Sequence, residues 1–474
     1  MRKITILFIC IVLLLITACK DGSISKQNTG ADNDNSNKIE LTIGGVWISN
    51  IPIIHRAVAE FNQNNETYMI QIKDYIDPAD EDLESALLRM HTEVIAGGGP
   101  DIIFDNFRRM FNGGPFLDLY PFIDADPELK REDFFPNMLK SMERPDGTLP
   151  MFANSFQDIS IMISTTEILG HIDKWTPSEF LKLAEDNPDM PYPFGVQTTG
   201  QMFIYDILRL NSADFINTQT YKANIDSPEF ILLLEAAKKF SQPSDESKTP
   251  NEDEIANDFF RMLKGEQLLS QYDLYGVKYY QLIAEIFGNN LVTMGLPSNN
   301  GGEYYLNVNA MMGINANTKH ADTAWEFLRM FLLPSAEFDE FQNFPLRIDL
   351  YEALVDDIMT PRYEINEDGN YIEVPHAIFI LDSYAIHQTT TVENAEGIVY
   401  ELYAMPENIA ENLRSLVESA KVARSFFPAG LNMIIYADLD AYFSGGRSAE
   451  ETARIMQNRI ETYLSELQLL AEVR

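Results

Sequence analysis

A chain of 474 residues with 72 acidic and 35 basic side chains has a formal net charge of −37, which argues against nucleic acid and anionic lipid surfaces as partners. The apolar content of 45% and the aromatic content of 11% are typical of a globular protein and exclude a disordered one. Length alone predicts two or three domains, or two lobes. The acidity permits a cationic ligand, although a solvated acidic surface explains it more simply.

The N-terminal segment has the pattern of an export signal. After Met1-Arg-Lys, residues 4–18 carry no charge, as in the n-region and h-region of a signal peptide. The run is shorter than the roughly 20 residues of a stable membrane span. It ends Leu-Ile-Thr-Ala-Cys19, which resembles the lipobox of bacterial lipoproteins. That resemblance implies cleavage before Cys19 and a lipid anchor on it; the alternative is a plain secretory signal followed by a chance cysteine.

Export fits the distribution of cysteine. The only other cysteine, Cys10, lies inside the signal peptide, so the mature chain has no thiol and no disulfide. An exported domain of this size can bury enough surface without disulfides. Residues 19–38 are mostly Ser, Asn, Asp, Gly and Lys, which predicts a flexible tether. We therefore expect a protein held by lipid on the outer face of the cell membrane.

Strand and helix patterns alternate after the tether. Alternating or buried apolar runs predict strands at 39–47, 68–75 and 101–104, and apolar stripes of helical spacing predict helices at 53–62 and 81–96. A strand-helix-strand-helix-strand order predicts a parallel sheet with right-handed crossovers. The first part of the chain is therefore expected to be an α/β unit.

The stretch from Val94 to Asn106 joins the second of these helices to the third strand. The glycines at 97–99 supply the positive φ values that close a helix, and Pro100 prevents the helix from resuming. Asp105 and Asn106 follow the strand at its C-terminal end, where open α/β sheets bind ligands. An ordinary connection between a helix and a strand is the alternative interpretation.

The rest of the chain predicts one further strand, one hairpin and many helices. The strand candidate is 158–163, and 362–374 contains Glu-Asp-Gly369 between two alternating runs, which indicates a hairpin. Apolar spacing predicts helices at 175–186, 230–240, 255–264, 277–287, 321–333, 406–422, 434–443 and 449–472.

No catalytic or metal-binding pattern is present in the sequence. The chain has no His-Glu-x-x-His, no Gly-x-Ser-x-Gly and no Gly-Lys-Ser/Thr phosphate loop, and its six histidines are scattered. Residues 32–35 are rich in Asp and Asn, but they lack the Gly and Glu of a calcium loop. We expect no enzyme activity, no cofactor and no metal.

Four sequence stretches together resemble the extracellular solute-binding lipoproteins of bacterial ABC importers, the family of sugar-binding receptors similar to maltose-binding protein. These stretches are 61–64 with 98–103, 313–320 with 324–328, 344–347, and 441–451 with 455–459. The resemblance implies an α/β, two-lobed periplasmic-binding-protein-like fold of type II, in which three crossover strands form a hinge.

The same resemblance implies the limits of the lobes and the function. Lobe one would hold 39–150 and 314–345, lobe two 160–305 and 350–474, with hinge segments near 150–159, 304–313 and 344–350. The segment 356–408 looks longer than in smaller members of the family. The protein would be a monomeric receptor that captures a solute, with a mono- or oligosaccharide preferred, and delivers it to a membrane permease. A receptor for peptides or another solute class is the alternative, and an exported enzyme acting on polysaccharide is a third.

A sugar-binding cleft needs aromatic rings for the apolar CH faces and polar side chains for the hydroxyls. Side chains of these kinds near the ends of predicted elements are Trp47, Asp105, Asn106, Asn154, Ser155, Phe156, Gln197, Gln201, Tyr205, Tyr272 and Tyr275. Trp47 ends the first strand and could instead be a core residue. Those from Gln197 onward could equally lie on plain surface or in the core. Trp175 and Trp325 are expected to lie in the core.

Overall fold

The computed structural model describes the chain from Lys38 to Glu472 with short gaps. The described residues are 38–76, 83–106, 114–144, 146–153, 155–170, 175–190, 194, 199–218, 220–240, 258–298, 301–308, 310–333, 344–382, 385–390, 397–422, 427 and 429–472. The predicted signal peptide, Cys19 and most of the tether lie outside these residues, as do Asn154 and Gln197. Among the helices that are described, none combines the length and the apolar character needed to cross a membrane.

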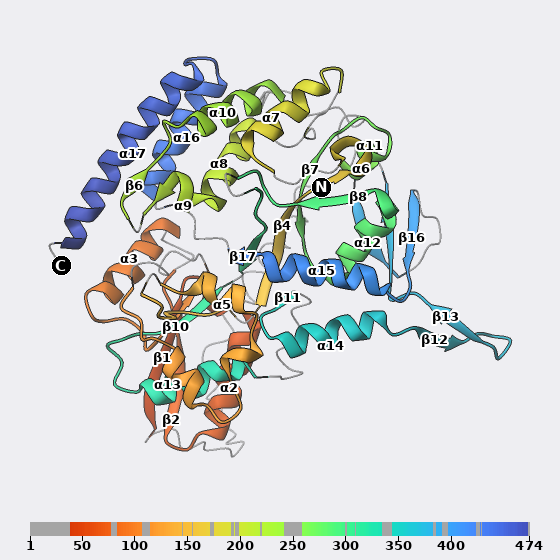
Figure 1. Cartoon of the computed structure of the whole chain (residues 1–474). Helices are drawn as coiled ribbons and strands as arrows, with labels where there is room; N and C mark the ends of the chain where they lie inside the picture. Colours follow the sequence, from red (N-terminus) through yellow and green to blue (C-terminus); the bar gives the residue numbers. More distant parts are fainter. Residues whose placement is uncertain are drawn as a thin grey trace, which may run out of the picture. The chain divides into compact units, whose positions relative to one another are not determined.

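The first sheet has four strands in the order β10-β3-β1-β2 (Figure 1). Its strands are β1 (Ile39–Gly45), β2 (Tyr68–Asp74), β3 (Ile102–Asp105) and β10 (Met311–Ile314). The helices and 3-10 turns that accompany it are η2 (Ile48–Asn50), α2 (Pro52–Asn64), α3 (Leu83–Ile95), α4 (Tyr120–Ala125), η3 (Arg131–Asp133), α5 (Pro136–Met142), α13 (Ala321–Leu328) and η6 (Arg329–Phe331). The predicted order of strands and helices at 39–104 is confirmed, and β1 and β3 are parallel.

The junction between α3 and β3 depends on glycine, as predicted. Gly97 and Gly99 have φ values of 86° and 85°, and a Cβ on Gly99 would lie 2.8 Å from Cγ2 of Val94. Asn315 secures the junction, because its Nδ2 donates to the carbonyl oxygens of Gly98 at 2.8 Å and Pro100 at 3.0 Å. The end of the helix is therefore tied to Asn315, the residue that follows β10.

The second sheet is built around the long strand β4 (Ser155–Thr165), which pairs antiparallel with four other strands. The partners are β7 (Ser270–Leu274), β8 (Leu291–Met294), β9 (Tyr305–Val308) and β11 (Phe344–Pro345), and β17 (Lys421–Val422) joins β9. Lys421 and Val422 were expected to end a helix at 406–422. The structure corrects this expectation: they form a strand because the second sheet offers them a parallel partner in β9.

Helices cover the second sheet on both faces. On one face, α7, α8, α10, α16 and α17 pack into a common core. This core includes Phe180 of α7 and Trp175, which is buried as expected. The other face packs α12 and α15 into the core that also contains the four-stranded sheet. The helices are α6 (Thr166–Leu169), α7 (Pro177–Asp186), α8 (Gly200–Leu210), α9 (Ser212–Phe215), α10 (Pro228–Phe240), α11 (Asp258–Leu263), α12 (Val277–Phe287), α14 (Ile348–Met359), α15 (Glu407–Ser419), α16 (Ala429–Phe443) and α17 (Ala449–Glu472).

The chain passes between the two sheets at three places. It leaves the first near Phe152, which bridges to Met312, and enters the second at Ser155. It returns between β9 and β10, and β11 then pairs again with β4. Three such passages are what the predicted fold class requires; the exact lobe and hinge limits stay a prediction.

Two helices of the predicted second lobe contact the predicted first lobe. The ring of Tyr351 on α14 lies 5.4 Å from that of Phe135, edge to face. Nδ2 of Asn137 on α5 donates to the carbonyl oxygens of Val417 at 2.9 Å and Ala420 at 2.6 Å. Both helices are therefore bound to residues near α5 as well as to the second sheet.

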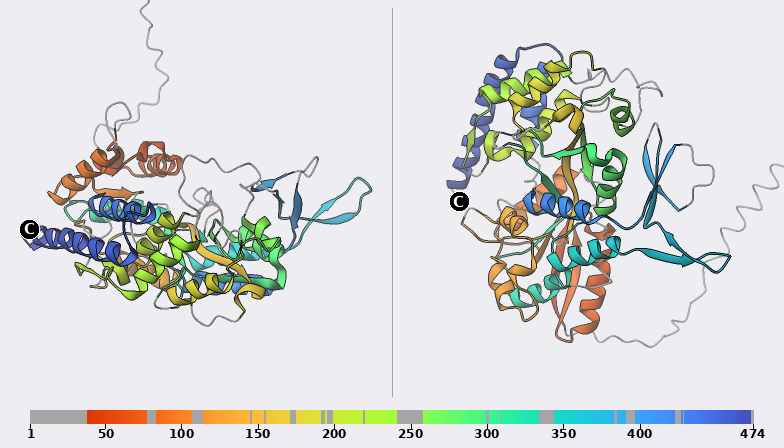
Figure 2. Two further views of the ribbon diagram at one scale, coloured as in Figure 1. Left: turned by 90° about the horizontal axis from the view of Figure 1, so that it is seen from above. Right: turned by 45° about the vertical axis from the view of Figure 1, so that its right-hand side comes forward.

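The segment 356–408 forms two small sheets. The predicted hairpin consists of β12 (Arg362–Ile365) and β13 (Tyr371–Val374), with Gly369 at a φ of 80° in its turn. A three-stranded sheet of β14 (Ala377–Leu381), β15 (Ile386–Thr389) and β16 (Ile398–Leu402) follows it. Figure 2 shows the hairpin projecting away from the helices. A third small sheet, elsewhere in the chain, pairs β5 (Ile216–Asn217) with β6 (Lys222–Ala223).

Candidate functional site

The first half of β4 has polar side chains on one face. Asp158 and Ser160 alternate with Ile159 and Ile161, and successive side chains of a strand point to opposite faces. Asp158 is opposite Asn307 of β9, and Ser160 is opposite a residue of β7, Asp273. The isoleucines join the core that contains α12, so the polar side chains lie on the face that α8 covers.

These side chains are linked by hydrogen bonds. Nδ2 of Asn307 donates to Oδ1 of Asp158 at 2.6 Å and lies 3.1 Å from Oγ of Ser160. Oγ of Ser160 donates to Oδ1 of Asp273 at 2.9 Å. The network therefore joins three neighbouring strands.

Helix α8 adds charged residues to this network. Nη1 of Arg209 donates to Oδ1 of Asn307 at 3.3 Å, and its Nε lies 3.5 Å from Oδ1 of Asp206. Nε2 of Gln271 donates to Oδ2 of Asp206 at 3.1 Å. We call the whole set the sheet-face cluster; its members are Asp158, Ser160, Asp206, Arg209, Gln271, Asp273 and Asn307.

Three members of the sheet-face cluster are buried and four are partly buried, and the cluster has more negative than positive side chains. Asp158 is 5% exposed and Arg209 is 8% exposed, and the cluster has three carboxylates and one guanidinium. The pKa of Asp273 is raised, mainly by burial and also by the charge of Asp206, although the hydrogen bond from Ser160 lowers it. Carboxylates, two amides and a guanidinium in one group can serve as hydrogen-bond partners for hydroxyls.

A second group of polar and aromatic side chains lies at the end of the four-stranded sheet. Trp47 follows β1 with a φ of 59° and is 39% exposed. The backbone N–H groups of Trp47 and Ser49 donate to the two carboxylate oxygens of Asp74, each at 2.9 Å. Nδ2 of Asn106 donates to the carbonyl oxygen of Val46 at 2.9 Å. Asp74 and Asn106 thus hold the turn after β1 from its two sides.

The two groups flank the same passage of the chain between the sheets. Asp105 is paired with Met311, the first residue of β10, while Asn307 lies four residues earlier in β9. At about 3.3 Å per extended residue, Asn307 and Met311 are at most about 13 Å apart. The short connection keeps the sheet-face cluster close to the end of β3.

The predicted candidates on β1 and β3 have different environments. Asp105 is the last residue of β3 and is fully buried, which corrects the expectation that it follows the strand. The strand extends by one residue because β10 pairs with Asp105. Asn106 is partly buried beside the turn that contains Trp47, so the structure brings these two predicted residues together.

The candidates on α8 lie beside the sheet-face cluster. Tyr205 directly precedes Asp206, stacks on Tyr436 with ring centroids 4.7 Å apart, and donates its hydroxyl hydrogen to Oδ1 of Asn432. Burial, followed by the neighbouring charges, raises the pKa of Tyr205 to about 12. Gln201 is partly buried near the start of the same helix.

The remaining described candidates lie in packing positions or on the surface. Phe156 is fully buried, and it pairs with β11 as does the neighbouring Ser155. Tyr272 packs on Phe259 with centroids 5.0 Å apart, on the face of β7 opposite to Asp273. Tyr275 is 45% exposed. Contact of any candidate with a ligand stays a prediction.

No member of the sheet-face cluster was among the predicted site residues. A usable signal was present on β4, where Asp158 and Ser160 interrupt a run of isoleucines with period two. No comparable signal marks Arg209, because its partner Asn307 is 98 residues away in the sequence.

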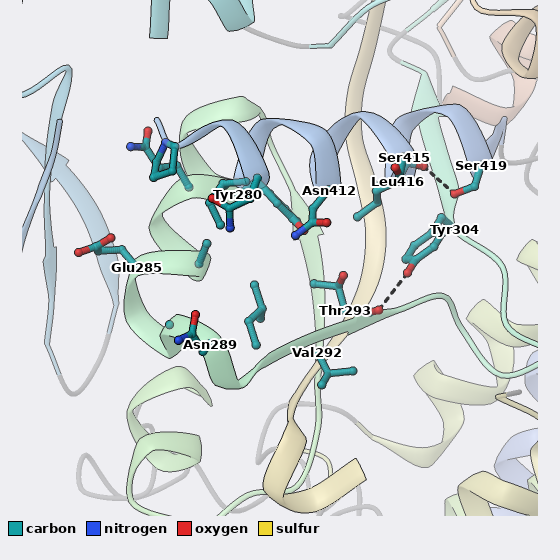
Figure 3. Close-up of a pocket in the computed structure, with 17 residues that line it drawn as sticks. Tyr280, Glu285, Asn289, Val292, Thr293, Tyr304, Asn412, Ser415, Leu416 and Ser419 are labelled. Carbon is teal, nitrogen blue, oxygen red and sulfur yellow. Dashed lines mark hydrogen bonds between the residues drawn. The ribbon is translucent and has the colours of Figure 1, made fainter. Parts of the chain in front are cut away.

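A groove of about 810 Å³ lies apart from this cluster, between α12, β8 and α15 (Figure 3). None of the predicted site residues lines it. Within the described part of the chain, no group of His, Cys, Asp and Glu is arranged to hold a metal ion.

Comparisons with known proteins relate this architecture to solved structures. No family model matches the chain, and no curated protein matches it. The sugar-binding protein MalE of Xanthomonas citri superposes with a TM-score of 0.56 at 13% identity, covering 92% of this chain and 100% of that one. An extracellular solute-binding protein of family 1 from Alicyclobacillus acidocaldarius gives a TM-score of 0.51 at 15% identity, covering 90% and 98%.

A further match is the cyclic α-maltosyl-1,6-maltose binding protein of Arthrobacter globiformis, with a TM-score of 0.50 at 14% identity, covering 90% of this chain and 100% of that one. Identities this low show the fold alone. The chain has the two-lobed α/β fold of the periplasmic binding proteins, and the predicted fold class is confirmed.

Proposed function

We propose that this chain is the substrate-binding receptor of an ABC importer and that it captures a mono- or oligosaccharide. The observation that carries the proposal is the position of the sheet-face cluster and of the group at Trp47 on either side of one passage between the sheets. Carboxylates and amides bind sugar hydroxyls, and an exposed indole offers a face for the CH groups of a sugar ring. A solute at this place contacts both sheets.

The names of the similar structures support this class of ligand. One is described as a sugar-binding protein and another as a binding protein for a cyclic maltosyl-maltose. The proposal includes two lobes, 39–150 with 314–345 and 160–305 with 350–474, joined near 150–159, 304–313 and 344–350. A ligand that contacts both lobes favours the form in which they approach each other. A membrane permease can then distinguish loaded from empty receptor by its shape.

A panel of possible ligands tests the proposed solute class. Because a ligand that binds only the folded state raises the melting temperature, the purified protein is screened with neutral mono- and oligosaccharides and with peptides of matched length. We expect a saturable rise with at least one saccharide. The rise should be lost in Asp158→Asn and kept in Asp226→Asn, an exposed aspartate outside the cluster. A rise with peptides alone would show that the receptor binds another solute class.

Incubation with polysaccharides tests the enzymatic alternative. We expect no new reducing ends from common plant and bacterial polysaccharides, measured over hours at high protein concentration. Steady release of reducing ends that is abolished in Asp158→Asn would show that the protein is an exported enzyme and not a receptor.

Attachment to the membrane is tested at Cys19. The proposed lipid sits on this residue, before the polar tether at 19–38. Cys19→Ser is expected to leave folding intact and to move the protein from the membrane fraction to the soluble exported fraction. Retention of the variant in salt-washed membranes would contradict lipid anchoring.

A further inference from the structure

The groove between α12 and α15 has walls from several parts of the chain. Helix α12 and the turn η5 (Gly288–Asn290) form one side, α15 forms the other, and β8 and Tyr304 lie between them (Figure 3). Helix α12 packs with the isoleucines of β4, so the groove and the sheet-face cluster are on opposite faces of the second sheet. The groove is therefore separate from the proposed sugar site.

Helix α15 presents an uncharged polar stripe to the groove. Asn408, Asn412, Ser415 and Ser419 line it, at spacings of four, three and four residues, which keep them on one helical face. The neighbouring stripe at 407, 411, 414 and 418 is fully charged and does not line the groove. Only one of the 17 lining residues is charged, Glu285, although 23% of the chain is charged. The groove therefore selects against charged ligands.

Several polar side chains of the groove lack partners in the described part of the chain. Gln281 is 6% exposed; its Nε2 donates to the carbonyl oxygen of Tyr403 at 2.9 Å, while its Oε1 has no hydrogen-bond partner. Buried acceptors of this kind nearly always have a partner. The amides of Asn289, Asn408 and Asn412 likewise make no hydrogen bond to described residues. The groove thus offers donors and acceptors that a ligand can use.

Two tyrosines line the groove. The hydroxyl group of Tyr304 donates to the carbonyl oxygen of Thr293 at 3.0 Å, which fixes its ring beside β8. Tyr280 is 4% exposed and also lines the groove. Aromatic rings next to neutral amides and hydroxyls match a ligand with apolar CH faces and many hydroxyls.

We propose that this groove is a second binding site, which takes a neutral, extended oligosaccharide. The polar stripe from Asn408 to Ser419 spans about 16 Å at 1.5 Å per residue of helix, which suits a chain of sugar rings better than one ring. A peptide has charged termini and charged side chains, and the groove has only one charged lining residue, Glu285, to pair with them. The inference goes beyond the proposed function, because this site lies on another face and would hold a polymer independently of the site at the sheet passage.

The test records the NMR signal of Tyr304 in the full-length protein labelled with fluorotyrosine, assigned with Tyr304→Phe. The probes are hexamers of glucose in α- and β-linkage, of xylose and of N-acetylglucosamine; hexagalacturonate is the charged comparison and a neutral hexapeptide the peptide comparison. We expect at least one neutral hexasaccharide to shift the signal saturably at millimolar concentration, whereas hexagalacturonate does not.

Three variants separate the two sites. Asn307→Ala disables the sheet-face cluster, Asn412→Ala removes one amide of the groove, and Glu411→Ala is the matched control on the charged stripe of the same helix. The shift should persist in Asn307→Ala and Glu411→Ala. In Asn412→Ala the saccharide affinity should fall about tenfold, as for the loss of one or two hydrogen bonds.

The other outcomes overturn either the inference or the proposed function, and the variants distinguish the two. No shift with any saccharide, or a shift with the hexapeptide alone, overturns it directly. A shift that disappears in Asn307→Ala and survives in Asn412→Ala shows a single site at the sheet passage, so the proposed function stands without the groove. Saccharide binding that depends only on Asn412 supports the groove and removes the site at the sheet passage.

Discussion

The sheet-face cluster and the groove between α12 and α15 are both polar, but they differ in whether their polar side chains have hydrogen-bond partners within the protein. In the cluster, carboxylates, two amides and a guanidinium pair with one another at distances from 2.6 to 3.5 Å. In the groove, uncharged amides stand without partners in the described part of the chain, and the buried Oε1 of Gln281 is among them. Burying an unpaired charge costs several kcal/mol, so a charged side chain inside the protein needs a partner. A neutral amide at an open groove can instead hydrogen-bond to water or to a ligand.

The largest expected difference between the two regions is the effect of removing an arginine. Arg209→Met removes the ion partner of Asp206 and the positive charge near Asp273, so we expect a loss of about 3 kcal/mol in the free energy of unfolding. Arg414→Met, on α15, breaks ion pairs with Glu352 and Glu418, whose side chains are half exposed. Its expected loss is below about 1 kcal/mol.

Urea denaturation of both arginine variants measures this contrast. Equal losses for Arg209→Met and Arg414→Met would mean that water screens the cluster as well as it screens the surface of α15.

Removal of one amide from each region gives a smaller contrast. Asn307→Ala deletes the donor to Oδ1 of Asp158, a side chain that is 5% exposed, and should cost about 1–3 kcal/mol of stability. Asn412→Ala deletes an exposed amide without a partner and should change stability by less than about 0.5 kcal/mol. Chemical denaturation measures the stability of both variants. A similar loss in both would show that the amides of Asn307 and Asn412 do not differ in how far they are hydrogen-bonded.

Trp47→Ala tests the aromatic side chain that accompanies the cluster across the passage. A fully buried tryptophan costs about 3–5 kcal/mol when truncated, the expected value for Trp175→Ala. Because Trp47 is 39% exposed, its variant should lose about 1–2 kcal/mol while saccharide affinity falls by more than tenfold. Calorimetry measures the saccharide affinity of the variant, and denaturation measures its stability. A loss of about 3–5 kcal/mol with unchanged affinity would identify Trp47 as a packing residue.

The smallest expected effect is a pH dependence from Asp273. Its pKa is raised above the model-peptide value of 3.8, mainly by burial, so the folded state binds a proton that the unfolded state has released. Stability must therefore fall as the pH rises from about 3.8 through the raised value. Asp273→Asn, which keeps an acceptor for Ser160, should remove this fall. Unfolding measured at several pH values checks it, and identical profiles for variant and wild type would contradict it.

Local patterns in the sequence were enough for much of the secondary structure. Glycines with positive φ end α3 as predicted, and Gly369 marks the hairpin of β12 and β13. The prediction erred where a strand partner from elsewhere in the chain decided the outcome. Asp105 belongs to β3 because β10 pairs with it, and Lys421 becomes a strand residue because β9 is beside it.

The sequence by itself determined where strands and helices alternate, because apolar periodicity and turn residues act within a few positions of each other. It also pointed to Trp47 and Asn106 through their places after strands. Only the tertiary structure decided which polar groups meet: Arg209 with Asn307, Ser160 with Asp273, and Gln281 with the carbonyl group of Tyr403. Their separations of 98, 113 and 122 residues are the physical reason, since the sheet register and helix packing that close such distances leave no mark on neighbouring residues.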